Sequence, residues 1–536
     1  MKSTMMTSPL LVSDMTERAS RLFFNVEVVS VLPDGTRNRS TLGDLHRRSR
    51  QLAGALQSAG LAKGDRVATL MWNEREHLEA YFSIPAAGGI LHALNMRLHI
   101  QDLAHVVAHA QDRFLIVEDV LLPIYQQLQQ FVEFERVFVV NRSGDKLPPG
   151  TECYEAFLAS FGGTFIPPVL DEEDPAAICY TSGTTGKPKG VVYSHRSICL
   201  HALCISLPDQ LSISRFDTVC PISSMFHVNA WGFPFAGVMA GSRIVLPGRN
   251  LQPEALLDLL AEEQVTITAA VPTVWMAILN ALESEPGEWK LSPKLRIAMG
   301  GAAAAESLFR RFDKLGVQVI QAWGMTETGP LATAATLKPG MDSWSDDDRY
   351  AQRSRQGMAL PFIQLRSIGE DGECPWDGET TGELEIRGPW VAAGYHGINQ
   401  SPQWTEDGWL RTGDVVSIDP EGYIKITDRL KDLIKSGGEW ISSVDLENTL
   451  VGHHAIREAA VIAVPHPKWQ ERPLAVIILR DGASVDAAEL RVFLEQSFAR
   501  WQVPDAFVFA EELPHTSTGK LLKTKLRNDF RDWQWE

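Results

Sequence analysis

The chain lacks the features that mark several large classes of protein. Its 536 residues contain only six cysteines, with no Cys-x-x-Cys pair and no cysteine–histidine group at zinc-ligand spacing. This pattern argues against a zinc site or a disulfide scaffold. Scattered cysteines in a long chain are typical of buried thiols in a reducing compartment, so we expect a cytoplasmic protein. The first residues also lack the apolar segment of a signal peptide.

Positive charge is scarce as well. The chain has 50 Lys+Arg against 67 Asp+Glu, which gives a formal net charge of −17. A nucleic-acid-binding protein would present a basic surface, so we expect no nucleic-acid partner. Hydrophobic residues make up 44% of the chain, close to the ordinary globular value, which argues against general disorder.

One uncharged stretch, residues 218–242, is long enough to cross a bilayer. It contains Pro221, Gly232, Pro234 and Gly237, which interrupt a helix and are costly in lipid. We therefore predict a buried strand–loop–helix passage and no transmembrane segment.

Strand and helix patterns alternate in the middle of the chain. Apolar or β-branched runs predict strands at 243–246, 265–268, 295–298 and 317–320. Helical spacing predicts helices at 253–264, 273–282 and 305–315. This order implies an α/β fold with a parallel sheet. Ligands of such sheets bind beyond the carboxyl ends of the strands, so the loops after residues 180, 299 and 323 are the first candidates for a site.

The pattern changes near Thr380, and the length of the chain also calls for more than one domain. Turn residues separate predicted antiparallel strands at 382–387, 409–419 and 423–427, which we expect to form a β-barrel-like part. A compact α+β unit follows, with helices predicted at 443–451 and 486–500 and strands at 459–464 and 474–479. We predict a large N-terminal domain, 1–428, and a small C-terminal domain, 429–536.

The strongest local motif is residues 180–190, Tyr-Thr-Ser-Gly-Thr-Thr-Gly-Lys-Pro-Lys-Gly, directly after an apolar strand. Glycines permit close backbone approach, and amides, hydroxyls and a lysine suit a phosphate chain. The motif is not the usual P-loop, because only two residues separate Gly183 from Gly186-Lys187. On composition alone, a flexible polar loop is an equal alternative.

Three further motifs carry candidate chemistry. Residues 323–328, Trp-Gly-Met-Thr-Glu-Thr, combine an aromatic that could stack on a base with an acid that could hold Mg²⁺. Asp414, in Arg-Thr-Gly-Asp, and Arg429 suit a ribose diol. Residues 514–520, Pro-His-Thr-Ser-Thr-Gly-Lys, end in Lys520. Each of these residues also has an ordinary structural interpretation. Taken singly, Trp323 is typical of a core aromatic, Glu327 of a solvated loop acid, Asp414 of a turn and Lys520 of a surface lysine.

The four motifs, in this order and spacing, resemble the adenylate-forming (ANL) superfamily of acyl-CoA synthetases, nonribosomal adenylation domains and beetle luciferases. The likeness extends from about Arg21 to Arg527. It implies two steps: a carboxylate attacks the α-phosphate of ATP to give an acyl-adenylate and pyrophosphate, and a thiol then displaces AMP. It also implies Mg²⁺ as cofactor, CoA as the thiol, and a small mobile C-terminal domain.

The resemblance implies a role for individual residues. The catalytic set is Lys520, Thr185, Glu327 and His227, in which Lys520 bridges the carboxylate and the α-phosphate, and Thr185 and Glu327 hold Mg²⁺. Trp323, where the family more often has tyrosine, stacks on adenine. The implied ATP/AMP-binding set is Thr181, Ser182, Gly183, Thr184, Thr185, Gly186, Lys187, Gly301, Ala302, Trp323, Gly324, Met325, Thr326, Asp414 and Arg429.

The resemblance also implies a hinge at Lys431, a residue that would otherwise read as a solvated lysine at a strand end. The small domain pivots there and brings a second set of residues to the CoA and thioester face. This set is Lys435, Ser436, Gly437, Gly438, Glu439 and Trp440.

The acyl pocket indicates the branch of the superfamily. His227 falls where the family carries an aromatic or histidine gate, and the implied pocket is His227, Trp231, Gly300 and Pro330. An amino-acid-activating enzyme needs an acidic side chain near the pocket to pair with the substrate amine. The only acidic residue close to His227 in sequence, Asp217, precedes the strand. We therefore favour a free-standing acyl-CoA synthetase.

Four further strings narrow the resemblance. Residues 193–197, 225–231, 436–442 and 499–504 look like those of bacterial medium-chain acyl-CoA synthetases and methylmercaptopropionate-activating enzymes. A short- or medium-chain acid is thus the expected substrate. The alternatives are a long-chain or aryl acid–CoA ligase, an adenylate-forming enzyme that does not use CoA, and a non-catalytic binding protein with the same fold. A homodimer is one option for the assembly.

Overall fold

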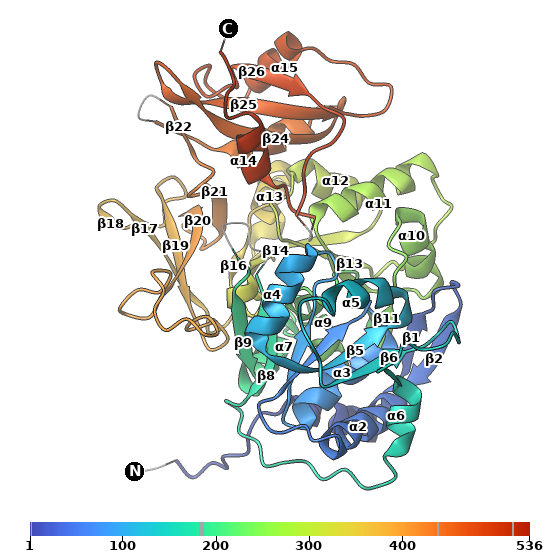
Figure 1. Ribbon diagram of the computed structural model, residues 1–536. Helices are drawn as coiled ribbons and strands as arrows, with labels where there is room; N and C mark the ends of the chain where they lie inside the picture. The colour runs from blue at the N-terminus through green and yellow to red at the C-terminus, as the bar shows by residue number, and fades with distance from the viewer. Residues whose placement is uncertain (2, 182–186, 437–438, 517–518, 536) are drawn as a thin grey trace.

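The computed structural model describes residues 1, 3–181, 187–436, 439–516 and 519–535. These residues form four β-sheets, of which two lie in the large lower body of Figure 1, one at its left edge and one in the small domain at the top. The architecture is mixed α/β with a smaller C-terminal domain, as the sequence predicts.

The first large sheet has seven strands in the order β7-β6-β5-β3-β4-β8-β9. All neighbours are parallel except β9, which returns antiparallel to β8 and so forms a hairpin around the glycine-rich motif. The strands are β3 (Arg66–Leu70), β4 (Ile90–Ala93), β5 (Asp112–Glu118), β6 (Arg136–Val140), β7 (Glu152–Cys153), β8 (Pro175–Tyr180) and β9 (Gly190–Ser194).

The second large sheet has nine strands in the order β16-β15-β14-β13-β12-β10-β11-β1-β2. Its centre, from β14 to β1, is parallel, which confirms the parallel sheet expected from strand–helix alternation. The strands are β1 (Glu27–Val31), β2 (Arg37–Thr41), β10 (Thr218–Cys220), β11 (Arg243–Leu246), β12 (Ile267–Ala270), β13 (Arg296–Met299), β14 (Gln318–Gly324), β15 (Leu331–Ala334) and β16 (Met358–Ala359).

Helices cover and join these two sheets. In one shared core, Tyr81 and Phe82 of α3 pack on Phe235 of α9, with ring centroids 5.3 and 5.6 Å apart. The helices of the large body are α1 (Val12–Leu22), α2 (Leu42–Ser58), α3 (Arg75–Ala86), α4 (Ile100–Ala110), α5 (Leu122–Leu128), α6 (Tyr154–Ser160), α7 (His195–Ile205), α8 (Val228–Trp231), α9 (Phe233–Ala240), α10 (Pro253–Glu262), α11 (Pro272–Ser284), α12 (Glu306–Lys314) and α13 (Asp346–Arg353).

The uncharged stretch at 218–242 folds as β10, a loop, α8 and α9, which confirms the predicted strand–loop–helix passage. Its side chains are almost all buried between the two sheets. None of the described helices combines the length and the apolar composition that a bilayer crossing needs.

The third sheet is antiparallel, in the order β18-β17-β19-β20-β21, but the expected barrel-like closure is wrong. No ladder joins β18 to β21 in the part of the chain that the structure describes, because β18 is only two residues long and β21 instead bridges to Gly357 of the large body. The strands are β17 (Gln364–Gly369), β18 (Gly372–Glu373), β19 (Thr381–Arg387), β20 (Leu410–Ile418) and β21 (Ile424–Arg429).

The fourth sheet forms the small domain, with order β23-β22-β25-β24 and β26 parallel to β25. Helix α14 matches its prediction, whereas α15 ends at Leu494 rather than residue 500, because the chain turns there to reach β26. The elements are β22 (Ile434–Ser436), β23 (Glu439–Ile441), β24 (Ile456–His466), β25 (Gln470–Leu479), β26 (Ala506–Phe509), α14 (Ser443–Val451), α15 (Ala487–Leu494) and α16 (Lys523–Asp529).

Candidate active site

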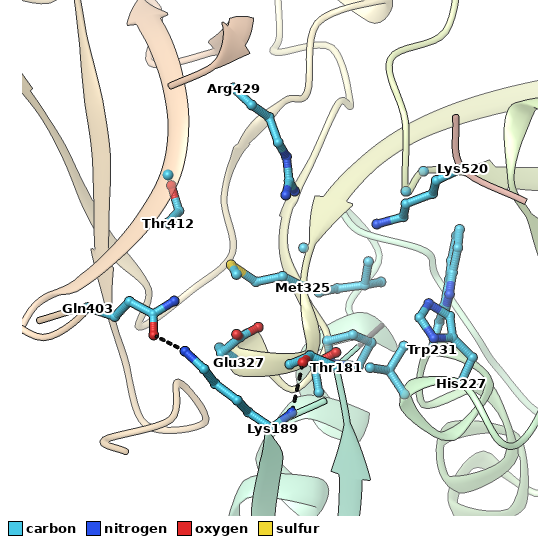
Figure 2. A pocket seen from close by; sticks show the side chains of 18 of the residues that line it. Thr181, Lys189, His227, Trp231, Met325, Glu327, Gln403, Thr412, Arg429 and Lys520 are labelled. Carbon is cyan, nitrogen blue, oxygen red and sulfur yellow. Dashed lines mark hydrogen bonds between the residues drawn. The ribbon is translucent and has the colours of Figure 1, made fainter. Parts of the chain in front are cut away.

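A cavity of about 610 Å³ lies where the carboxyl ends of β13 and β14 meet the third sheet and the loop that carries Lys520. Figure 2 shows Arg429, Lys189 and Lys520 entering this space from three different directions. The cavity brings together many of the residues singled out in the sequence: Thr181, Lys187, His227, Trp231, Gly300, Gly301, Gly324, Met325, Thr326, Glu327, Pro330, Arg429, Lys431 and Lys520.

A second cavity, of about 280 Å³, adjoins the first and shares several of its wall residues. The residues predicted from the sequence that line this second cavity are Gly301, Ala302, Trp323, Gly324, Asp414, Arg429, Lys431 and Lys520. We treat the two cavities together as the candidate site, because residues of the large body and of the small domain line both.

The Asp414 carboxylate has a partner on each oxygen. The indole Nε1 of Trp323 donates a hydrogen bond to Oδ2 over 2.9 Å, and the Nε of Arg429 lies 3.0 Å from Oδ1. Asp414 and Trp323 are buried, so their hydrogen bond is sheltered from water, whereas the Arg429 side chain is 43% exposed. The sequence motifs indicate a shared ribose site for Asp414 and Arg429 but not the contact with Trp323, because no local pattern signals a hydrogen bond between residues 91 positions apart.

Glu327 lies in a short 3₁₀ turn, Thr326–Thr328, directly after β14. Its carboxylate is buried and accepts a hydrogen bond from the Tyr395 hydroxyl. The Nζ of Lys189 sits 4.7 Å from the centre of the Tyr395 ring and donates to Oε1 of Gln403 over 3.2 Å. Tyr395 and Gln403 were not predicted from the sequence, because they lie in loops without a recognisable motif.

Lys520 reaches the cavity from a tight turn of the small domain. Its backbone N–H donates to the Thr516 hydroxyl over 3.1 Å, and Gly519 in the turn has a φ of +83°. Burial and, to a smaller extent, the nearby Arg429 cation lower the pKa of Lys520 to about 8, while Asp414 and Glu327 act in the opposite sense. The lysine therefore stays largely protonated at pH 7.

The space for Lys520 depends on Gly301. A Cβ added at Gly301 would lie 3.4 Å from Cε of Lys520 and 3.3 Å from Val271. Gly301 also has a φ of +82°, which L side chains rarely adopt. The loop after β13 thus allows a close approach of the lysine stem to the backbone.

The predicted acyl-pocket residues His227, Trp231, Gly300 and Pro330 also line this cavity, and Trp231 lies on the same side as Gly301 and Lys520. Burial, with a further contribution from Lys520, lowers the pKa of His227 to about 3, so this imidazole is neutral. A Cβ on Gly300 would come 2.5 Å from the Ala322 carbonyl oxygen and 3.5 Å from the Trp231 ring.

Residues 228–231, which form α8, adopt an unusual backbone. Their φ angles are +42°, +54°, +49° and +59°, so one turn of non-glycine residues is left-handed. Each such residue costs roughly 1–2 kcal/mol relative to the right-handed form. A turn of this kind persists only where the surrounding structure holds it.

Some predicted residues lie away from both cavities or outside the described part of the chain. Lys435 and Trp440 face each other across the β22–β23 hairpin, with Nζ 5.1 Å from the ring centre, and Ser436 accepts a hydrogen bond from Arg472. With Glu439, these residues are absent from the described cavity walls. Outside the described residues lie Ser182, Gly183, Thr184, Thr185, Gly186, Gly437 and Gly438.

Two family models match the chain. The AMP-binding enzyme model matches residues 17–396, and the AMP-binding enzyme C-terminal domain model matches residues 445–520. Both matches cover elements that line the two cavities.

Curated relatives align with almost the whole chain. A long-chain-fatty-acid–CoA ligase of Thermus thermophilus is 45% identical, over 99% of this chain and 97% of the relative. A 3-methylmercaptopropionyl-CoA ligase of Ruegeria lacuscaerulensis is 42% identical, over 99% of both. A medium-chain-fatty-acid–CoA ligase of Ectopseudomonas oleovorans is 40% identical, over 99% of this chain and 98% of the relative.

Solved structures share the fold. An anthranilate CoA ligase, AuaEII, solved with anthranoyl-AMP, has a TM-score of 0.86 at 24% identity and covers 98% of both chains. ATP-bound MatB from Rhodopseudomonas palustris has a TM-score of 0.80 at 25% identity, over 97% of this chain and 99% of that one. The family models and the curated relatives show that the chain belongs to the AMP-binding enzyme family.

Proposed function

We propose that this AMP-binding enzyme acts on a short- or medium-chain carboxylic acid with an uncharged tail. The chain is an acid–thiol ligase of the AMP-forming type. It activates the acid with ATP, giving an acyl-adenylate and pyrophosphate, and then transfers the acyl group to CoA with release of AMP.

The single observation that carries this proposal is the convergence of Lys520, Arg429, Glu327 and Lys189 on one cavity from separate elements. Cations held in a sheltered space stabilise negative charge where it develops in the transition state. In adenylation that charge gathers at the α-phosphate and the attacking carboxylate. We assign Lys520 to this point, because it is buried, still largely protonated at pH 7 and placed between the two cavities.

For the nucleotide, we assign Asp414 and Arg429 to the ribose hydroxyls, Trp323 and Ala302 to the adenine side, and Thr326 to the α-phosphate. We assign the binding of the β- and γ-phosphates to the motif from Thr181 to Lys187. The Trp323 and Arg429 contacts support these roles by holding the Asp414 carboxylate in one orientation.

Magnesium fits the same end of the cavity. Mg²⁺ prefers oxygen ligands and is held in such sites by one or two protein oxygens together with substrate phosphates. Glu327 presents a buried carboxylate at the cavity wall, and its partner Tyr395 holds one oxygen in place. We assign Glu327 and Thr185 to the metal, which would neutralise phosphate charge during adenylation.

For the acid, we assign His227, Trp231, Gly300 and Pro330 to the acyl pocket. Its walls are apolar apart from a neutral His227, which offers no cation to a second carboxylate. A monocarboxylic acid with an apolar tail therefore suits it best. The relatives named for long-chain acids, medium-chain acids and methylmercaptopropionate support a thioether or alkyl tail.

We further propose that domains 1–428 and 429–536 meet at a hinge, Lys431. In the present arrangement Lys520 fills the cavity while Lys435, Ser436, Glu439 and Trp440 stay outside its walls. A rotation of the small domain would exchange these two faces, so one cavity serves adenylation first and thioester formation second. Gly437 and Gly438 complete the proposed CoA face.

The test is a panel of acids from acetate to laurate, incubated with ATP, Mg²⁺ and CoA and assayed for acyl-CoA and AMP. We expect acyl-CoA with a maximum among short or medium chains. AMP release that needs no CoA, with no acyl-CoA formed, would establish an adenylate-forming enzyme of another branch. A maximum with long-chain or aryl acids would correct the substrate class alone.

Two assignments outside the site complete the proposal. All six cysteines are free and five are buried, which supports a cytoplasmic, reducing environment. The homodimer stays a prediction, and sedimentation velocity of the purified protein checks it.

A further inference from the structure

We propose that Asn73 is a positioning residue that holds the acyl side of the cavity in its working shape. Asn73 follows β3 of the seven-stranded sheet, whereas the acyl-pocket segment follows β10 of the nine-stranded sheet. The residue thus spans the two sheets at the carboxyl ends of their strands. This inference rests on the proposed function, because it concerns the binding of the acid.

The Asn73 carboxamide binds backbone groups of three alternate residues in the segment before His227. Its Nδ2 donates to the carbonyl oxygens of Pro221 and Ser223 over 2.7 and 2.9 Å, and its Oδ1 accepts from the Met225 N–H over 2.8 Å. The side chain is 3% exposed, so water does not compete for these groups. Only a carboxamide offers two donors and an acceptor in one plane at this length.

A second side chain completes the clamp. The Tyr81 hydroxyl, on α3, donates to the Met225 carbonyl oxygen, so both peptide groups of Met225 are held by the segment that follows β3. The backbone of Asn73 is fixed in turn, because its carbonyl oxygen accepts from the Gly248 N–H over 3.1 Å. Asn73 and Tyr81 together therefore tie the loop to a rigid support.

What this clamp holds is the left-handed turn at residues 228–231. The His227 N–H donates to the Ser224 carbonyl oxygen over 2.9 Å, which links the clamped segment directly to the turn. At the far end, Gly232 lies so close to His201 that a Cβ would come within 2.7 Å of that ring. A strained turn held at both ends presents His227 and Trp231 in one orientation, and release of either end lets it relax.

The inference predicts an effect confined to the acid. Glu327, Asp414 and Arg429, at the nucleotide side, belong to elements after β14 and in β20 and β21, and the clamp makes no contact with them among the described hydrogen bonds. Loss of the clamp should therefore change the acyl pocket while the ATP contacts stay in place. If Asn73 had a merely structural role, its loss would weaken the binding of the acid and of ATP together.

The experiment compares Asn73→Ala with Gln352→Ala by steady-state kinetics and thermal unfolding. Gln352 is a matched control, because its buried carboxamide donates to Asp419 over 2.8 Å and neither residue lines the two cavities described. We expect Asn73→Ala to lower kcat/KM for the acid roughly 10- to 100-fold, as a misplaced reacting group does. The KM for ATP should stay within about twofold, and the preference among chain lengths should flatten.

Tyr81→Phe is the second variant, since it removes one hydroxyl of the clamp at nearly constant volume. It tests the proposal even if Asn73→Ala fails to fold. It should shift the acid parameters in the same direction by a smaller factor. Equal effects on acid and ATP, or a loss of Tm with unchanged kinetics in both variants, would overturn the proposal. Failure of the wild-type enzyme to form any acyl-CoA would instead overturn the proposed function.

Discussion

The nucleotide side and the acyl side of the cavity differ in what shapes them. At the nucleotide side, each carboxylate is held by polar side chains: Asp414 is paired with Arg429 and Trp323, and Glu327 with Tyr395. At the acyl side, the shape comes from the backbone, through the glycine at residue 300 and the left-handed turn at 228–231.

The difference has a physical reason. Phosphates and a ribose carry many polar atoms, so they require oriented partners with defined charge. An alkyl tail has no such polar atoms and is selected by the volume and shape of an apolar wall. We therefore expect substitutions at the nucleotide side to change activity by altering charge, and substitutions at the acyl side to change it by altering the volume and shape of the pocket.

Lys520→Ala tests the charge of the nucleotide side and should have the largest effect. Adenylation should fall about a hundredfold or more, equivalent to roughly 3 kcal/mol of transition-state stabilisation. Thioester formation from supplied acyl-adenylate should persist, because Lys520 serves the first step. Lys525→Ala is the control, since that side chain is exposed in an ion pair with Asp529. Unchanged pyrophosphate exchange in Lys520→Ala would refute the assigned role.

Gly301→Ala tests whether backbone space matters at the junction of the two sides. The added Cβ approaches Cε of Lys520 at 3.4 Å and strains a φ of +82°. Adenylation should fall roughly tenfold or more through displacement of the lysine. Gly316→Ala is the matched control, with a φ of +73° and nothing within 4 Å of the new Cβ. Equal losses of activity in the two variants would assign the effect to backbone strain alone.

The pH profile separates the two sides by their titrating groups. Because the pKa of Lys520 is lowered to about 8, its positive charge is lost as pH rises through that value. Adenylation should then fall about tenfold for each further pH unit. His227, with a pKa near 3, stays neutral throughout and should contribute no step between pH 6 and 9. A flat profile up to pH 9.5 would contradict the role of Lys520.

Trp323→Phe should have the smallest effect, because it keeps an aromatic ring while it removes the N–H that donates to Asp414 and part of the ring area. The KM for ATP should rise roughly fivefold, and the KM for the acid should not change. With 3′-deoxy-ATP the difference between the tryptophan and phenylalanine enzymes should shrink, since the ribose contact of Asp414 is then weakened. A rise in the acid KM instead would place Trp323 at the acyl side.

Local patterns predicted much of the fold. Helix α14 and strand β11 have the predicted bounds, because capping and apolar runs are local properties. Strand β12 is shifted by two residues from 265–268 to Ile267–Ala270, since a uniformly β-branched run does not mark where pairing starts. The barrel-like closure was wrong because closure depends on partners that lie far away in the chain.

The candidate site was predictable where its chemistry is carried by a short string. Lys520, Glu327, Asp414 and Arg429 belong to such strings, and the structure brings them to one place. Tyr395, Gln403 and Asn73 do not, and their contacts cross 68, 214 and about 150 positions. Such contacts leave no local periodicity or spacing to read.

The sequence by itself determined the family, the two-step chemistry and the identity of the charged groups, because these depend on residue type and order along the chain. Only the tertiary structure decided how Asp414 is oriented, how the pKa of Lys520 is lowered and how the turn before Gly232 is held. Orientation, burial and strain depend on neighbours that folding brings together from separate sheets. For that reason the acyl side, shaped by its backbone, became visible only in three dimensions.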